Sequence, residues 1–309
     1  TNFPYSTLPA NPPSDDYGKT YAWTDVSYMI GGYGWKARFM DKDGYIITGK
    51  KVQYNLETKG WVAYHDTEKP GTKKYDCGPC HTSGYRYAGN QGSLKGIVGT
   101  WQEEGITCEE CHGPGSQHIA TNGLELMLVD RDPAACGKCH LRGSPTGIDA
   151  SGGFIKHHEQ WEEMYQTKKK AMNCVSCHNP HESSRYKDAT TSPTKGITTT
   201  CESCHYKEAQ GTVTVAKHTA TYPSCITCHM PEAVKSAVGD TTKWNGDVKS
   251  HMFRINTSAT AKQFDTAGTK AMPYLTIGFA CKQCHYSGGT ATVKTDAVLS
   301  AAAKDYHVK

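Results

Sequence analysis

The stretch Cys108-Glu-Glu-Cys111-His112-Gly-Pro-Gly-Ser-Gln-His118 contains the pattern that decides the fold of this 309-residue chain. Its first five residues, Cys-x-x-Cys-His, form a motif that occurs seven times and uses all 14 cysteines. The cysteines are Cys77 and Cys80, Cys108 and Cys111, Cys136 and Cys139, Cys174 and Cys177, Cys201 and Cys204, Cys225 and Cys228, and Cys281 and Cys284. The histidines that follow them are His81, His112, His140, His178, His205, His229 and His285.

Cys-x-x-Cys-His is the covalent attachment signal of c-type haem. On a helical turn, residues three and four positions apart share one face. The two thiols can therefore each form a thioether with one porphyrin, while the histidine reaches the iron as proximal ligand. The sequence thus predicts seven covalently bound haem c groups, with the 14 cysteines as attachment points and the seven histidines as proximal ligands.

Zinc ribbons and thioredoxin-like redox sites also use Cys-x-x-Cys pairs. Neither requires histidine as the next residue, and histidine occupies only about one position in twenty of this chain, so seven chance occurrences are negligible. Seven is also an odd number for paired zinc ribbons, and no cysteine remains for a disulfide. These alternatives are therefore rejected in favour of haem.

Eight further histidines are candidate distal ligands of the irons. They are His65, His118, His157, His158, His181, His218, His251 and His307. If each of the seven irons binds a histidine on both faces, seven of these eight histidines are needed. The count therefore favours bis-histidine ligation and low reduction potentials. Successive helical side chains point about 100° apart, so one of the adjacent pair His157 and His158 is the expected spare. Met230 directly follows a proximal histidine and is better placed to pack against a porphyrin than to ligate.

The chain divides into three predicted segments. Residues 1–20 are rich in proline and are expected to form an extended arm. Residues 21–65 contain no cysteine, and their apolar runs alternate with turn signals, which predicts a small β-meander. The predicted strands are Val26–Ile30, Trp35–Met40, Tyr45–Thr48, Val52–Leu56 and Trp61–Tyr64.

Residues 66–309 are the predicted seven-haem cytochrome c region. The whole chain has about 44 residues per haem. This is close to the size of about 40 residues below which a domain usually needs disulfides, metals or oligomerisation to fold. We therefore expect mostly irregular loops with short helices around stacked haems. One longer amphipathic helix is predicted over Phe154–Asn173, and Asp188–Thr200 is expected to be an exposed loop.

Composition excludes several classes of protein. No stretch approaches the roughly 18 apolar residues of a membrane-spanning helix. The formal charge of +4 is too small to indicate a nucleic-acid partner, and adding the propionates and ferric irons of seven haems makes it about −3 when oxidised. The chain begins Thr1-Asn2-Phe3-Pro4, which we expect to be a mature N-terminus after export. Haem attachment outside the cytoplasm agrees with an extracytoplasmic location.

Two motifs carry extensions that resemble those of a known superfamily. One is the Gly-Pro-Gly-Ser-Gln-His118 run after His112, and the other is Asn-Pro-His181 after His178. They resemble multihaem cytochromes of the hydroxylamine-oxidoreductase and tetrathionate-reductase type and their electron-transfer relatives. The resemblance covers roughly residues 77–285 and implies that His118 and His181 ligate neighbouring haems. Unlike the nitrite-reductase-type enzymes, this chain has no Cys-x-x-Cys-Lys motif.

The many haems held by little protein also resemble filament-forming extracellular cytochromes, in which one subunit donates a distal histidine to the next. His307 is the candidate donor here, and an open head-to-tail contact would generate a filament. The expected function is therefore electron hopping in an extracellular conductive filament, without catalysis, whose partners are further copies and redox proteins or extracellular acceptors. A soluble periplasmic electron shuttle and a redox enzyme with one five-coordinate haem stay open as alternatives.

Overall fold

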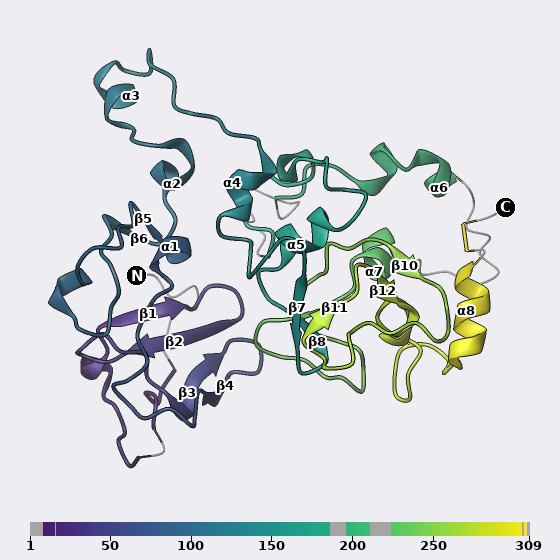
Figure 1. The fold of residues 1–309 in the computed structure, drawn as a ribbon, viewed down its shortest axis with the longest axis horizontal. Coiled ribbons are helices and arrows are strands. Elements are labelled where there is room, and N and C mark those ends of the chain that lie inside the picture. Colours follow the sequence, from purple (N-terminus) through teal and green to yellow (C-terminus); the bar gives the residue numbers. More distant parts are fainter. Residues whose placement is uncertain (1–8, 16, 186–195, 211–223, 305, 308–309) are drawn as a thin grey trace. The chain divides into compact units, whose positions relative to one another are not determined.

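The computed structural model describes residues 9–15, 17–185, 196–210, 224–304 and 306–307. The chain forms two compact units, residues 1–130 and residues 131–309. In Figure 1 the first runs from purple to blue and the second from teal to yellow. The unit boundary falls inside the predicted segment 66–309, so the first two motifs belong to the first unit and the other five to the second.

The first unit contains an antiparallel four-stranded sheet, as the alternating sequence predicts. Its strands follow one another in the order β1 (Tyr28–Gly31), β2 (Lys36–Met40), β3 (Gly49–Asn55) and β4 (Gly60–Tyr64). Tyr28 pairs with Met40, and Asn55 pairs with both Lys36 and Gly60. The predicted strand Tyr45–Thr48 is absent as a strand; among these residues only Ile46 forms a single bridge, to Met40.

Two small cores support this sheet. Phe39, Ile47 and Val52 belong to one buried cluster, and Ile97 and Trp101 belong to a second one, against which Cys77 also packs. The remaining elements of the first unit are short. They are η1 (Trp23–Asp25), α1 (Gly78–His81), β5 (Thr82–Ser83), η2 (Gln91–Ser93), β6 (Glu103–Glu104), α2 (Cys108–His112) and α3 (Ser116–Ala120).

Part of the predicted N-terminal arm lies on its own unit. The backbone N–H of Ser14 donates to the carbonyl of Lys51 at 3.0 Å, and Oδ2 of the buried Asp15 accepts the hydroxyl of the core residue Tyr21 at 3.2 Å. Residues 1–8 and 16 lie outside the described residues.

The second unit is built around a sheet with the strand order β11-β7-β8-β9. Its buried residues include Ile148, Ile155, Val234 and Leu275. The helices and strands of this unit are α4 (Pro133–Gly137), β7 (Ile148–Ser151), β8 (Phe154–Lys156), α5 (Gln160–Tyr165), η3 (Cys174–Ser176), η4 (Cys201–Ser203), α6 (Tyr206–Gln210), α7 (Cys225–His229), β9 (Val234–Lys235), β10 (Ile255–Asn256), β11 (Lys270–Ala271), β12 (Leu275–Thr276), η5 (Gly278–Lys282) and α8 (Asp296–Lys304).

The predicted helix over Phe154–Asn173 is wrong. Phe154 and Ile155 lie on strand β8, and only the six residues of α5 are helical. The cause is the pair Gly152 and Gly153, which have positive φ values of 59° and 80° and connect Ser151 to its partner Phe154 in a two-residue hairpin. This hairpin buries both Phe154 and Ile155, which a helical reading would have placed on different faces.

Short helices separated by irregular loops dominate both units, as predicted for a chain whose core is completed by haem. Of the predicted loop Asp188–Thr200, only residues 196–200 are described. No helix in the described ranges has the length and apolar character needed to cross a membrane.

Candidate functional site: seven haem-attachment motifs

All seven motifs adopt the helical turn that haem attachment requires. In the first motif the N–H of Cys80 donates to the carbonyl of Cys77 at 3.2 Å, which closes one turn. The same bond joins the cysteines of the motifs at 136, 174, 201 and 281, and the other two motifs lie within helices α2 and α7. Two thiols and one imidazole are thereby brought to one side of each turn.

Every cysteine is a free thiol, and all 14 lie in described residues. The thiols are therefore available for thioether bonds. A zinc site would gather further ligands, but the described parts of the chain hold no group of three or more His, Cys, Asp or Glu side chains that could bind a bare metal ion. The free thiols and the helical turns of the motifs fit c-type haem.

Several motif histidines have one ring nitrogen fixed by a backbone carbonyl. His112 Nδ1 lies 2.5 Å from the oxygen of Leu128, His229 Nδ1 lies 2.7 Å from that of Phe253, and His285 Nδ1 lies 2.6 Å from that of Thr292. Metal-bound histidines usually donate the N–H of their other ring nitrogen in this way. The bond leaves Nε2 as the nitrogen that can bind iron.

Three motif histidines face a second imidazole at a separation that fits an iron between them. The ring centroids are 6.3 Å apart for His140 and His158, 6.2 Å for His178 and His251, and 5.8 Å for His229 and His307. Either histidine of such a pair would be an axial ligand of a bound haem, whose iron would supply one-electron chemistry. Each of these three pairs of histidines would hold the iron of one haem between its two imidazoles.

The rings of the adjacent histidines lie 4.5 Å apart, and the identity of the spare ligand stays a prediction. His158, with a φ of 73°, faces His140, whereas Nε2 of His157 lies 3.5 Å from Arg142 Nη1. His307 faces His229 of its own chain, so the structure gives no support to the predicted donation of His307 to a neighbouring subunit.

The other candidate distal histidines have different surroundings. His118 Nδ1 lies 2.8 Å from the carbonyl oxygen of Glu125, the same kind of bond that the motif histidines make. His65 Nδ1 lies 2.5 Å from Glu68 Oε1, and the backbone N–H of His181 donates to Asn179 Oδ1. His218 lies outside the described residues.

The five motifs of the second unit neighbour one another in chain order. A hydrogen bond with Cys136 raises the pKa of Cys174, which places the third and fourth motifs in contact. Burial and then the charges of Cys201 and Cys204 raise the pKa of Cys177.

The same order continues to the end of the series. Burial, followed by the charge of Cys201, raises the pKa of Cys225. Burial, followed by the charge of Cys284, raises the pKa of Cys228 to about 11. The third to seventh motifs therefore form one continuous series.

Three buried glutamates, one at the N-cap of α5 and two within it, accept backbone N–H groups from neighbouring segments. Glu162 Oε1 accepts the backbone N–H groups of Arg142 and Gly143, just after the third motif. Glu163 Oε2 accepts the N–H of His251, and Glu159 Oε2 accepts that of Asp149. Burial is the main cause that raises the pKa of Glu159 and of Glu163 to about 8. Sequence reasoning missed this cluster because glutamates in a short helix normally face solvent.

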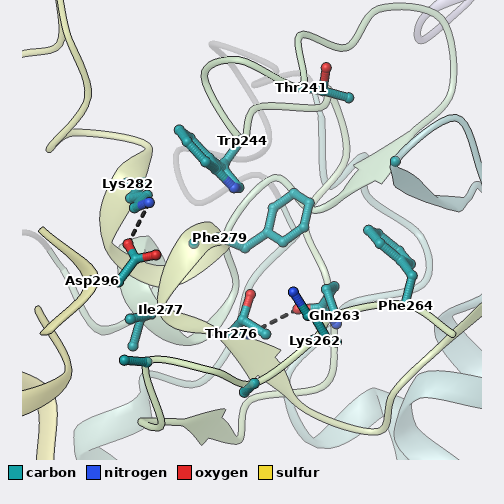
Figure 2. Close-up of a pocket in the computed structure, with 14 residues that line it drawn as sticks. Thr241, Trp244, Lys262, Gln263, Phe264, Thr276, Ile277, Phe279, Lys282 and Asp296 are labelled. Atoms are coloured by element: carbon teal, nitrogen blue, oxygen red, sulfur yellow. Dashed lines mark hydrogen bonds and ion pairs between the residues drawn. The ribbon is translucent and has the colours of Figure 1, made fainter. Parts of the chain in front are cut away.

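A cavity of about 280 Å³ lies beside the seventh motif. It is lined by residues that include Trp244, Phe279 and Lys282, and Lys282 forms an ion pair with Asp296, another lining residue (Figure 2). Its lining contains neither cysteine nor histidine. The cavity is therefore not a haem-attachment site.

Comparison with known proteins supports the haem assignment. The family model described as cytochrome c554 and c-prime matches residues 48–113, which include the first two motifs. The model described as a doubled CXXCH motif matches residues 167–210, which include the fourth and fifth.

Two relatives share more of the chain. It is 24% identical over 208 residues to the dissimilatory sulfite reductase MccA of Wolinella succinogenes, an alignment that covers 57% of this chain but only 27% of MccA. The solved structure of that octahaem protein matches with a TM-score of 0.56 and 15% identity, covering 89% of this chain and 57% of that one. The outer cell wall cytochrome OcwA matches with a TM-score of 0.50 and 16% identity, covering 91% and 75%. The chain is thus a multihaem c-type cytochrome that shares its fold with MccA and OcwA.

Proposed function

We propose that this chain conducts electrons through seven c-type haems, one at each Cys-x-x-Cys-His motif, without catalysing a reaction of its own. When bound, haem supplies reversible one-electron chemistry at its iron. The observation that carries the proposal is the continuous series of the third to seventh motifs. Thiols of successive motifs are close enough to perturb one another, so porphyrins bonded to them would be near neighbours.

The axial ligands support conduction. The spacing of their rings makes His158, His251 and His307 the proposed distal ligands opposite His140, His178 and His229. The remaining candidates for the other irons are His65, His118, His157, His181 and His218. An iron held by imidazole on both faces has no open position for substrate, which favours outer-sphere electron transfer.

Spin state and stoichiometry test this proposal in the purified holoprotein. A pyridine haemochrome assay should give seven haems per chain, and the ferric protein should show only low-spin signals in electron paramagnetic resonance. The His251→Met variant should change the signals of one haem and leave the others. A substantial high-spin signal in the unaltered protein at neutral pH would contradict the closed irons.

A redox enzyme is the second candidate, and the match to MccA favours it. An enzyme of that type would keep one iron open on its distal side. Reduced holoprotein should then turn over sulfite, and sulfite should shift a high-spin signal. If the protein only conducts electrons, sulfite should leave the electron paramagnetic resonance spectrum unchanged. Chelated ferric iron should then oxidise all haems of the reduced holoprotein.

We further propose that the protein works outside the cytoplasm, at the cell surface. Support comes from the fold shared with the outer cell wall cytochrome OcwA and from c-type haem attachment. The resemblance to filament-forming cytochromes also supports head-to-tail self-association, although His307 lies opposite His229 within the chain. Electron micrographs of the holoprotein should show filaments, and dispersed single particles at high concentration would exclude them.

A further inference from the structure

One short segment of the second unit, residues 250–253, reaches the histidines of two different motifs. His251, at its second position, faces His178 of the fourth motif with the ring centroids 6.2 Å apart. The carbonyl oxygen of Phe253, at its last position, lies 2.7 Å from Nδ1 of His229 in the sixth motif. Only one residue of backbone separates the two contacts, so a displacement of the segment at one motif reaches the other.

The start of this segment is buried and tied to the loop that follows the sixth motif. Ser250 and Met252 are both fully buried. The N–H of Ser250 donates to the carbonyl of Pro231 at 3.0 Å, and Pro231 lies two residues after His229. The N–H of Met252 donates to the hydroxyl of Ser250 at 3.2 Å, which fixes the turn within the segment.

The last residue of the segment, Phe253, has a strained backbone. Its φ of 58° is left-handed, a conformation that is costly for a bulky side chain and persists only where the surroundings impose it. The Phe253 ring stands edge-on to the ring of His251, with the centroids 6.1 Å apart. The strained residue therefore contacts His229 through its carbonyl and His251 through its ring.

A buried carboxylate fixes the backbone of the segment at His251. Glu163 lies on α5, 88 residues earlier in the chain, and is fully buried. Its Oε2 accepts the backbone N–H of His251, while Nδ1 of the same histidine lies 3.9 Å from Oε2, beyond hydrogen-bond distance. Glu163 thus holds the main chain at residue 251 and leaves the imidazole to be placed by that main chain.

We propose that residues 250–253 position ligands of two haems at once, His251 for the fourth and His229 for the sixth, and that Glu163 is the positioning residue that fixes them. A hydrogen bond to the second ring nitrogen of a metal-bound histidine sets the orientation and basicity of the imidazole. Displacing the segment should therefore alter both haems, whereas replacing only the side chain of His251 should alter one. This inference rests on the ligation proposed above for the fourth and sixth haems.

Electron paramagnetic resonance of the ferric holoprotein tests the proposal. His251→Met and His307→Met each replace one proposed distal ligand, so they identify the low-spin signals of the fourth and of the sixth haem. Glu163→Leu removes the acceptor of the His251 N–H and should shift the g values of both sets. Glu163→Gln keeps an acceptor oxygen and should return both sets toward their positions in the unaltered protein.

Ser250→Ala is a milder variant whose result does not depend on how Glu163→Leu folds. It removes the hydroxyl that accepts the N–H of Met252 and should shift both sets of signals by a smaller amount. Ser258→Ala is the matched control, because the Ser258 hydroxyl accepts the N–H of Thr260 in the same way, at 3.3 Å, in an exposed turn. It should shift neither set.

The inference is overturned if Glu163→Leu or Ser250→Ala shifts only one of the two sets, or shifts them no more than Ser258→Ala does. If Glu163→Leu binds no haem, Ser250→Ala alone decides. If His251→Met or His307→Met changes no signal, the proposed ligation fails, and this inference fails with it. The ligand variants thus distinguish a wrong ligand assignment from a wrong account of the segment.

Discussion

Replacing Glu162 by leucine should destabilise the second unit, because this side chain holds the loop that follows the third motif. The side chain is fully buried, and Oε1 accepts the N–H groups of Arg142 at 2.6 Å and Gly143 at 2.8 Å. Arg142 and Gly143 are exposed and the two bonds are partly buried, so the loss of each bond costs about 0.5–1.5 kcal/mol. The expected net loss is about 1–3 kcal/mol of unfolding free energy.

The matched control is Glu162→Gln, which keeps an acceptor oxygen at the same place and should cost no more than about 1 kcal/mol. Urea unfolding of the two holoproteins, followed by far-ultraviolet circular dichroism, measures the difference. The Soret band should change at lower urea in the leucine variant, since His140 lies just before the released loop. Equal unfolding midpoints for the two variants would show that the carboxylate does not hold this loop.

Three further predictions concern ligation, packing and pH. His158→Met should alter the low-spin signals of one haem whereas His157→Met should not, and the reverse result in electron paramagnetic resonance would show that the other histidine is the ligand. In Gly78→Ala the new Cβ would lie 2.3 Å from the Tyr85 ring, so the free energy of unfolding should fall by about 1–3 kcal/mol and the melting temperature should fall with it. In the control Gly60→Ala the new Cβ would meet no atom within 3.5 Å, so the melting temperature should change little. Burial raises the pKa of Glu159 from 4.5 to about 8, so the stability associated with this group is fully present below pH 4.5 and is lost as the pH rises to about 8. Between pH 4.5 and 8 the urea midpoint should fall less steeply in Glu159→Gln than in the unaltered protein. An equal pH dependence of the two proteins would show that Glu159 does not cause the loss of stability.

The sequence predicted the parts of the fold that follow from local chemistry. Five motifs form a helical turn because the backbone N–H of the second cysteine donates to the carbonyl of the first, and the other two lie within the short helices α2 and α7. The four-stranded sheet follows from alternating side chains and turn residues between Tyr28 and Tyr64. Both patterns act over a few residues, so no knowledge of distant parts of the chain is needed.

The helix predicted over Phe154–Asn173 shows where local patterns are insufficient. The apolar residues of this stretch have helical spacing, but the Gly152-Gly153 turn reverses the chain. Phe154 and Ile155 therefore pair with strand β7 instead of starting a helix. The glutamates of α5 were missed for a related reason. Their acceptor roles depend on backbone N–H groups from loops up to 88 residues away in the chain.

The sequence by itself determined the cofactor chemistry, because covalent attachment depends only on the order and spacing of neighbouring residues. It also supplied the set of histidines that are the candidate distal ligands. Only the tertiary structure decided which of them meet: His158 rather than His157 faces His140, and His307 faces a histidine of its own chain. The contacts between the successive motifs of the second unit were likewise decided by tertiary structure. The physical reason is that ring separations and electrostatic fields depend on distances between residues far apart in the chain, which folding sets and residue order does not.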